Sequence, residues 1–139
     1  MSEDLYFIKK IDYLKSIGSD KVNHAGKNLL EHLIGTSEKL KELGAKLYLQ
    51  DAGLFHSVYG TTYFMPDQGL VDDRQIVIDL IGKQAEDIAY WFCILDKPRT
   101  EQILKFKGQL KKDLLMLDFA NEEDIANSRM MTMEEAYDL

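Results

Sequence analysis

The sequence predicts an all-α fold, a compact helical bundle formed by one domain over residues 1–139. In several segments, apolar residues recur at spacings of three and four, the period of an amphipathic helix. Glycines and a proline stand where these segments end, as expected of helix stops. Stretches that alternate as strands do are short and scarce. The length of 139 residues suits a single core.

The first half is expected to contain three helices. Residues 4–17 place apolar side chains at spacings of three, and residues 26–43 carry leucines on one helical face; each segment is followed by a glycine. Residues 46–56 are short and strongly apolar, which is typical of a central helix buried on most sides. Residues 63–71 have no clear period, so we expect an ordered loop there that covers the entrance of a pocket.

The second half is expected to contain three more helices and a terminal turn. Acidic caps predict a helix over residues 72–80, and residues 83–95 form another that ends before a proline. Residues 100–121 carry a broad apolar face and predict one continuous helix. An interruption is expected at residues 127–128, followed by one more turn over residues 134–137.

Composition and charge narrow the classes of function. The chain has 17 basic and 24 acidic residues and a net charge of -7, which disfavours nucleic acid and anionic membrane surfaces as partners. No run approaches the ~18 apolar residues of a membrane span, and the N-terminus lacks a secretory pattern. Cys93 is the only cysteine, so no internal disulfide can form. These features predict a cytoplasmic protein.

Two histidines and one aspartate stand at positions where a bundle would place apolar residues. His32 lies at the margin of an apolar stripe, His56 ends the next buried helix, and Asp118 follows an unbroken apolar stretch. A buried carboxylate is costly unless a cation or hydrogen-bond donors lie beside it. Two imidazoles and a carboxylate suit a divalent transition metal, Mn, Fe or Zn, if the three meet. The alternative for each histidine is a hydrogen-bonded core residue.

The order of these residues resembles the HD superfamily of metal-dependent phosphohydrolases. The likeness rests on Glu31-His32-Leu33 in one helix, Ala52-Gly53-Leu54-Phe55-His56 at the end of the next, and a later Asp118 followed by Asn121. Within that superfamily the chain resembles the hydrolase half of the RelA/SpoT homologues, which cleave pyrophosphate from guanosine tetraphosphate. The likeness includes residues 81–88 and covers most of residues 24–125. The motif A-G-L-F-H-S-x-Y-G-T is also similar to that of an uncharacterised family of small domains.

The resemblance implies an HD-like bundle with a site between the second, third and last long helices. It implies His32, His56 and Asp118 as metal ligands, with Asn121 as a contact either to a metal ligand or to the substrate. The small-molecule ligand it implies is phosphorylated or a nucleotide. The polar residues expected to line that pocket are Ser57, Tyr59, Thr61, Asn121, His24 and Lys27.

The chain departs from the hydrolases at two places. The metal-ligating aspartate that follows their second histidine is replaced by Ser57, and an alcohol is a poor ligand. Their acidic pair that positions the attacking water corresponds to Gly60 and Thr61. Three ligands can still hold a metal, but a general base that orients the nucleophile is missing. We therefore expect weak or absent activity on the substrate of that superfamily.

The sequence leaves three functions open. The preferred one is a divergent HD-like metal-binding protein that hydrolyses a phosphorylated or nucleotide small molecule. The second is a catalytically inactive module that binds a small molecule or another protein, with a homodimer formed through the three methionines of residues 130–133. The third is a motif that only preserves the fold.

Overall fold

The computed structural model describes residues 2–24, 27–60, 74–95 and 98–137 and confirms the predicted all-α bundle. Its helices are α1 (Ser2–Ser16), α2 (Leu29–Glu42), α3 (Leu47–Leu54), α4 (Arg74–Ile81), α5 (Lys83–Ile94), α6 (Arg99–Ile103) and α7 (Gly108–Tyr137). A short 3₁₀ turn, η1 (Ser19–Lys21), follows α1. A two-stranded antiparallel ribbon then pairs β1 (Asn23–His24) with β2 (Lys27–Asn28) before α2 begins.

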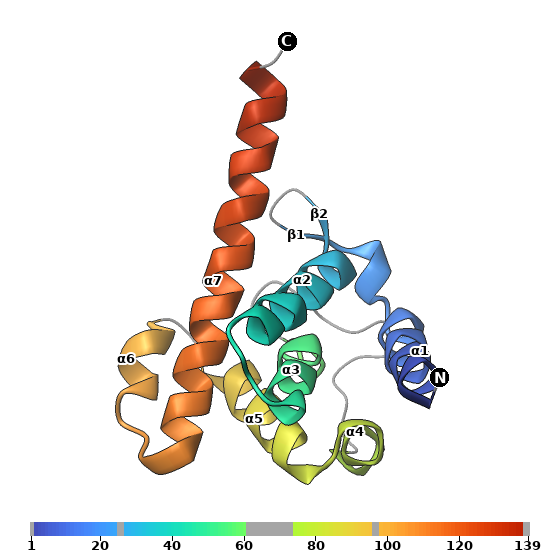
Figure 1. Cartoon of the computed structure of the whole chain (residues 1–139), viewed down its shortest axis with the longest axis vertical. Helices are drawn as coiled ribbons and strands as arrows, with labels where there is room; N and C mark the ends of the chain where they lie inside the picture. The colour runs from blue at the N-terminus through green and yellow to red at the C-terminus, as the bar shows by residue number, and fades with distance from the viewer. Residues whose placement is uncertain (1, 25–26, 61–73, 96–97, 138–139) are drawn as a thin grey trace.

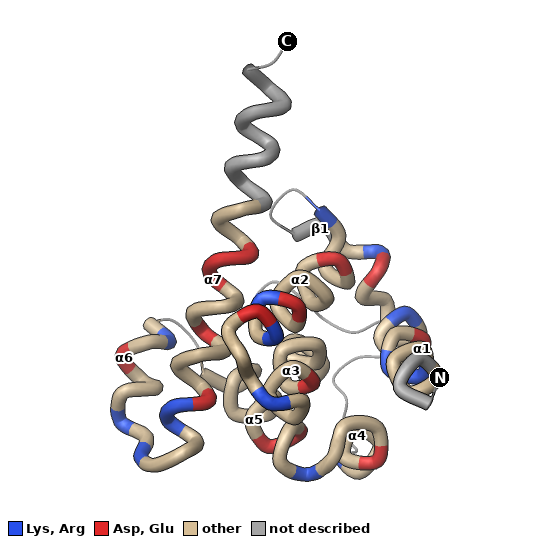
Figure 2. Tube along the Cα trace, viewed as in Figure 1, with Lys and Arg blue, Asp and Glu red and all other residues tan. Residues whose placement is uncertain are grey.

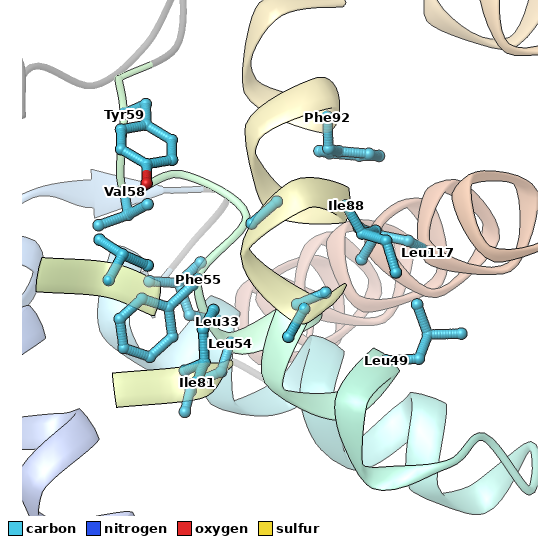
Figure 3. Close-up of a cluster of buried hydrophobic side chains, with 14 of the residues drawn as sticks. Leu33, Leu49, Leu54, Phe55, Val58, Tyr59, Ile81, Ile88, Phe92 and Leu117 are labelled. Atoms are coloured by element: carbon cyan, nitrogen blue, oxygen red, sulfur yellow. The ribbon is translucent and has the colours of Figure 1, made fainter. Parts of the chain in front are cut away.

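Helices α2, α3, α5 and α7 form the centre of the bundle. α2 packs chiefly against α3 and α7, and α3 also packs against α5 (Figure 1). Apolar side chains from these four helices meet in one cluster, in which Leu33, Phe55 and Leu117 are fully buried (Figure 3). Because burial of such side chains is the main favourable term in folding, this cluster fixes how the four helices lie together. It thereby brings α2, the end of α3 and α7 to one place.

The start of α2 corrects the predicted helix over residues 26–43. The helix begins at Leu29, since Lys27 and Asn28 belong to β2. Asn28 has extended backbone angles and accepts from the Glu31 N–H, and the Glu31 carboxylate accepts from the Asn28 N–H. This reciprocal capping box fixes the first turn of α2 and the position of the residues that follow it.

The predicted continuous helix over residues 100–121 is wrong. α6 ends at Ile103, and α7 begins only at Gly108, whose φ of 68° lies in the left-handed region that favours glycine. The apolar spacing predicts one helix because residues buried on both sides of a turn can keep helical spacing. The interruption expected at residues 127–128 is also wrong, because α7 continues to Tyr137. Weak helix formers cost only a few tenths of a kcal/mol each, about 0.7 at most, so two of them do not end a helix.

Charged residues of both signs are spread over the bundle (Figure 2). Lys and Arg occur in several helices, and Asp and Glu are interspersed with them (Figure 2). Among the described residues, no helix combines the length and the hydropathy needed to cross a bilayer. The predicted loop over residues 63–71 and the two predicted capping aspartates that follow it lie outside the described residues.

Candidate functional site: a buried histidine centre

The His32 imidazole is held by protein groups at both ring nitrogens. His32 follows the capping box by one residue and is only 1% exposed on the inner face of α2. Its Nδ1 lies 2.6 Å from Oδ2 of Asp124, and its Nε2 lies 2.7 Å from Oδ1 of Asn121. The Asp124 carboxylate accepts from Nδ1, and the side-chain amide of Asn121 occupies Nε2. The ring is therefore fixed in place from both sides by α7.

Asp124 connects this histidine to the surface. Its second oxygen accepts from the Lys27 ammonium at 3.0 Å. Burial alone would raise the pKa of Asp124, but the hydrogen bonds from His32 and Lys27 outweigh it and hold that pKa below its ordinary value. Asp124 therefore stays ionised and serves two donors at once.

Gly35 makes room for this carboxylate. A Cβ atom at position 35 would lie 2.1 Å from Oδ1 of Asp124 and 3.2 Å from Nζ of Lys27. Real Cβ atoms do not approach other atoms that closely, so a larger residue here would have to displace the ion pair. The absence of a side chain on Gly35 is thus a condition for the close approach of α2 and α7 at Asp124.

His56 meets His32 in the core. It lies in the turn after α3, is 3% exposed, and places its ring edge-to-face with that of His32 at a centroid distance of 5.2 Å. Its Nδ1–H donates to the Gly53 carbonyl at 2.6 Å, so a neutral ring carries its lone pair at Nε2. Phe92 packs against the same ring at 5.3 Å, and the Cys93 thiol donates to the His56 carbonyl at 3.0 Å. The two histidines predicted from sequence to be neighbours are therefore brought together.

Asp118 is buried beside a different partner. Its carboxylate is 7% exposed and accepts from the Thr100 hydroxyl of α6 at 2.6 Å. The expectation that a donor would lie beside it is met by this hydroxyl. Within the described ranges, no three His, Cys, Asp or Glu side chains are arranged to hold a metal ion.

His32 and Asp118 could hold a metal only if each gave up its present hydrogen-bond partner. The Nε2 atom of His32, through which it would coordinate an ion, is occupied by the Asn121 amide. An ion at this atom would have to displace that amide, while Asp118 would have to leave Thr100. The metal ligands implied by the HD resemblance therefore remain a prediction.

The other predicted pocket residues take separate places. Ser57 and Tyr59 are buried in the turn after α3, but the Tyr59 hydroxyl donates to Glu86 of α5 at 2.6 Å. Lys27 and Asn121 belong to the histidine network described above. His24 lies in β1 and its side chain is outside the described residues, as is Thr61.

The Glu86 carboxylate is a second buried polar centre that sequence reasoning missed. Glu86 is 0% exposed, and Arg74 donates to both of its oxygens, from Nε at 2.6 Å and from a terminal nitrogen at 2.8 Å. The Arg74 guanidinium also lies 3.7 Å from the centroid of the Tyr90 ring. Burial, followed by the contact with Glu86, raises the pKa of Tyr59, so its hydroxyl stays protonated. This cluster joins the turn after α3 to α4 and α5.

A polar groove lies on the outer side of the histidine network. It has a volume of about 400 Å³, in the range of small-molecule sites, and runs between α2 and α7. Lys27 and Asp124 form part of its wall. Its charged lining consists of four acids and two bases: Glu31, Glu38, Glu42, Asp124, Lys27 and Lys39.

Sequence reasoning overlooked Asp124 although a signal was present. Asp118, Asn121 and Asp124 are spaced by three residues, which places all three near one face of a helix. That polar stripe pointed to a partner on the facing helix. Gly35 could not have been identified without knowing which helix face approaches it.

Comparison with known proteins gives a family without an activity. A family model described as a domain of unknown function, DUF6817, matches residues 13–97, which is more than half of the chain. The match spans both histidines and ends before α7. No curated protein and no solved structure matches the chain.

Proposed function

The chain belongs to the DUF6817 family, and we propose that it is a non-hydrolytic, HD-like module that binds a small amine-bearing molecule in the groove between α2 and α7. The observation that carries the proposal is the double engagement of Asp124. One oxygen of this carboxylate fixes the buried His32, and the other holds Lys27 in the wall of the groove. The histidine centre then acts as a rigid support for a binding surface.

The charges of the groove favour an amine over a phosphate. Lys27 is already paired with Asp124, and Lys39 lies 3.8 Å from Glu42. The remaining acids of the lining, Glu31 and Glu38, leave the groove net negative. A phosphorylated ligand would be repelled unless it released Lys27 from its partner, whereas an ammonium group would be attracted.

Thermal unfolding of the full chain with a panel of ligands tests this proposal. A ligand that binds only the folded state at 100 times its Kd stabilises it by about 2.7 kcal/mol, a Tm increase of about 10 °C for a chain of this size. We expect an increase with putrescine or free amino acids and none with inorganic phosphate, GDP or GTP. Glu38→Gln should reduce the shift, while Glu101→Gln on α6, outside the groove lining, should leave it unchanged. The proposal fails if no amine shifts the Tm or if both variants respond alike.

A second candidate function is the metal-dependent hydrolase implied by the HD resemblance. The observation that favours it is that both histidines have their Nδ1 atoms held by protein oxygens, from Asp124 and from the Gly53 carbonyl. Metal-ligating histidines are oriented in this way, with Nε2 directed at the ion. A bound ion would supply polarisation of a phosphoryl oxygen. The chain's own contribution would be to orient the two rings and to exclude water from them.

Metal content separates the two candidates. Under the hydrolase candidate, protein purified without chelator contains near-stoichiometric Mn, Fe or Zn, which is lost in His56→Ala and in Asp118→Ala. His24→Ala is the matched control, because it removes an imidazole outside the pair. Wild-type protein that stays free of metal after all three ions are supplied would end this candidate and leave the amine-binding proposal intact.

A further inference from the structure

The outer face of α7 carries exposed apolar side chains opposite the core. Leu114, Leu117 and Ala120 are fully buried against the bundle. Met116 and Phe119 are 36% and 50% exposed, and Phe119 is rotated about 200° around the helix axis from Leu117. An exposed phenylalanine and methionine one turn apart on the outer side of a long helix indicate an unpaired face.

The sequence extends this face along the whole helix with a heptad spacing. Steps of four and three residues connect Lys112, Met116, Phe119, Glu123, Ala126, Met130, Met133 and Tyr137. Of these eight positions, only Lys112 and Glu123 are charged. α7 runs to Tyr137, and its C-terminal part extends beyond the ribbon formed by β1 and β2 (Figure 1). Alternating steps of four and three are the pattern of a helix that pairs with another helix.

We propose that two copies of the chain form a homodimer through this face of α7, with the two helices antiparallel. In the register that pairs the alternate heptad positions, Met116 lies opposite Met133 of the other copy, and Phe119 lies opposite Met130. Tyr137 then lies opposite Lys112. The two helices overlap over residues 112–137, a length of about 38 Å. The exposed Met116 and Phe119 of each copy are thereby covered by the C-terminal part of α7 of the other copy.

The charges along α7 select the antiparallel arrangement. The N-terminal part of the helix carries two lysines and one aspartate and is net positive (Lys111, Lys112, Asp113). The C-terminal part and the residue after it carry one arginine and three acids and are net negative (Arg129, Glu134, Glu135, Asp138). Antiparallel pairing places the basic end of one helix beside the acidic end of the other. Parallel pairing would place like charges together, which costs affinity.

Sedimentation equilibrium of the full chain over the micromolar range tests the interface. We expect a reversible dimer for the wild type and a monomer for Met133→Glu, because a buried carboxylate at a heptad position opposes pairing. Thr132→Glu adds the same charge one position away from the face and should remain dimeric. Circular dichroism shows whether both variants keep their helices. A wild type that is monomeric at every concentration, or two glutamate variants that behave alike, overturns the proposal.

Disulfide formation tests the orientation. In the antiparallel register, the two copies of residue 133 are about 26 Å apart, far beyond the about 4.4–6.8 Å that a disulfide spans between Cα atoms. Met133→Cys alone should therefore stay uncrosslinked on mild oxidation, whereas Met116→Cys combined with Met133→Cys should give a covalent dimer. Crosslinking of the single variant, or none in the double variant, contradicts the antiparallel register. The native Cys93 is present in both and serves as an internal control.

Discussion

Gly35→Ala should destabilise the chain when Asp124 is present, but it should be neutral or stabilising when Asp124 is replaced by alanine. The added Cβ would lie 2.1 Å from one oxygen of Asp124 and 2.9 Å from its Cγ. Both atoms belong to a carboxylate held by His32 and Lys27, so it cannot move without loss of those contacts. Displacement of the carboxylate therefore breaks the connection between α2 and α7.

The expected cost follows from the contacts that are lost. A hydrogen bond to a charged group contributes about 1.5–3 kcal/mol, and the contact with His32 is of this kind. The partly exposed Lys27 pair adds about 1 kcal/mol or less, and crowding in a packed site adds about 1–3 kcal/mol. Alanine is a better helix former than glycine by about 1 kcal/mol, which offsets part of the loss. Gly35→Ala should therefore lower the free energy of unfolding by about 2–6 kcal/mol.

Urea unfolding followed by circular dichroism measures this cost in two backgrounds. In the wild type we expect the full loss and a Tm lower by roughly 7–20 °C. In the Asp124→Ala background the carboxylate is gone, so the same substitution should be neutral or should stabilise the chain by up to about 1 kcal/mol. An equal loss in both backgrounds would show that Gly35 matters for another reason and would refute the account of the helix approach.

Three further predictions concern buried ionisable side chains. Hydrogen bonds hold the pKa of Asp124 in the folded chain below its unfolded value. The stability that this carboxylate contributes is therefore present above about pH 4 and is lost as the pH falls through the folded pKa. In denaturant titrations at a series of pH values, Asp124→Asn should reduce the loss of stability between about pH 4 and the folded pKa. Glu86→Ala leaves Arg74 without its buried acceptor and should cost about 3 kcal/mol in urea unfolding. Asp87, whose side chain is 47% exposed and lies 3.5 Å from the same guanidinium, supplies the control: Asp87→Ala should cost less than about 1 kcal/mol. Burial raises the pKa of the Cys93 thiol to about 12, so the native protein should react with Ellman's reagent at pH 8 at least ~100-fold more slowly than the unfolded chain; equal rates would contradict this.

Helix existence could be predicted from the sequence, but two boundaries could not. The apolar period and the stop at Gly44 located α2 well at its C-terminal end. The start of α2 could not be located, because β2 is a two-residue strand and is too short to show an alternation of apolar and polar residues. The division of residues 100–121 into α6 and α7 depends on the positive φ of Gly108, and a glycine within a helical pattern can equally be tolerated inside the helix.

The meeting of His32 and His56 was predicted, whereas the partners of their rings were not. The HD resemblance implied that the two histidines meet at one centre with Asp118, whereas the Asp118 carboxylate accepts from Thr100. Which oxygen each nitrogen binds depends on the rotation of α7 against α2, and that rotation is set by the packing of Leu117 and Ala120. A rotation of α7 by about 100°, the angle between successive residues, decides whether Asn121 or another residue faces Nε2, and the apolar period does not determine the rotation that precisely.

The short motif around His56 joins three helices, which explains why its polar residues need not share one ligand. His56 is directed toward His32 of α2, while Tyr59, three residues later, binds Glu86 of α5. Within the turn that separates them, the side chains of His56 and Tyr59 point to different sides, so one segment can form both contacts. Each contact satisfies a buried polar group that would otherwise lower stability. The motif therefore holds the bundle together where α2, the turn after α3 and α5 meet.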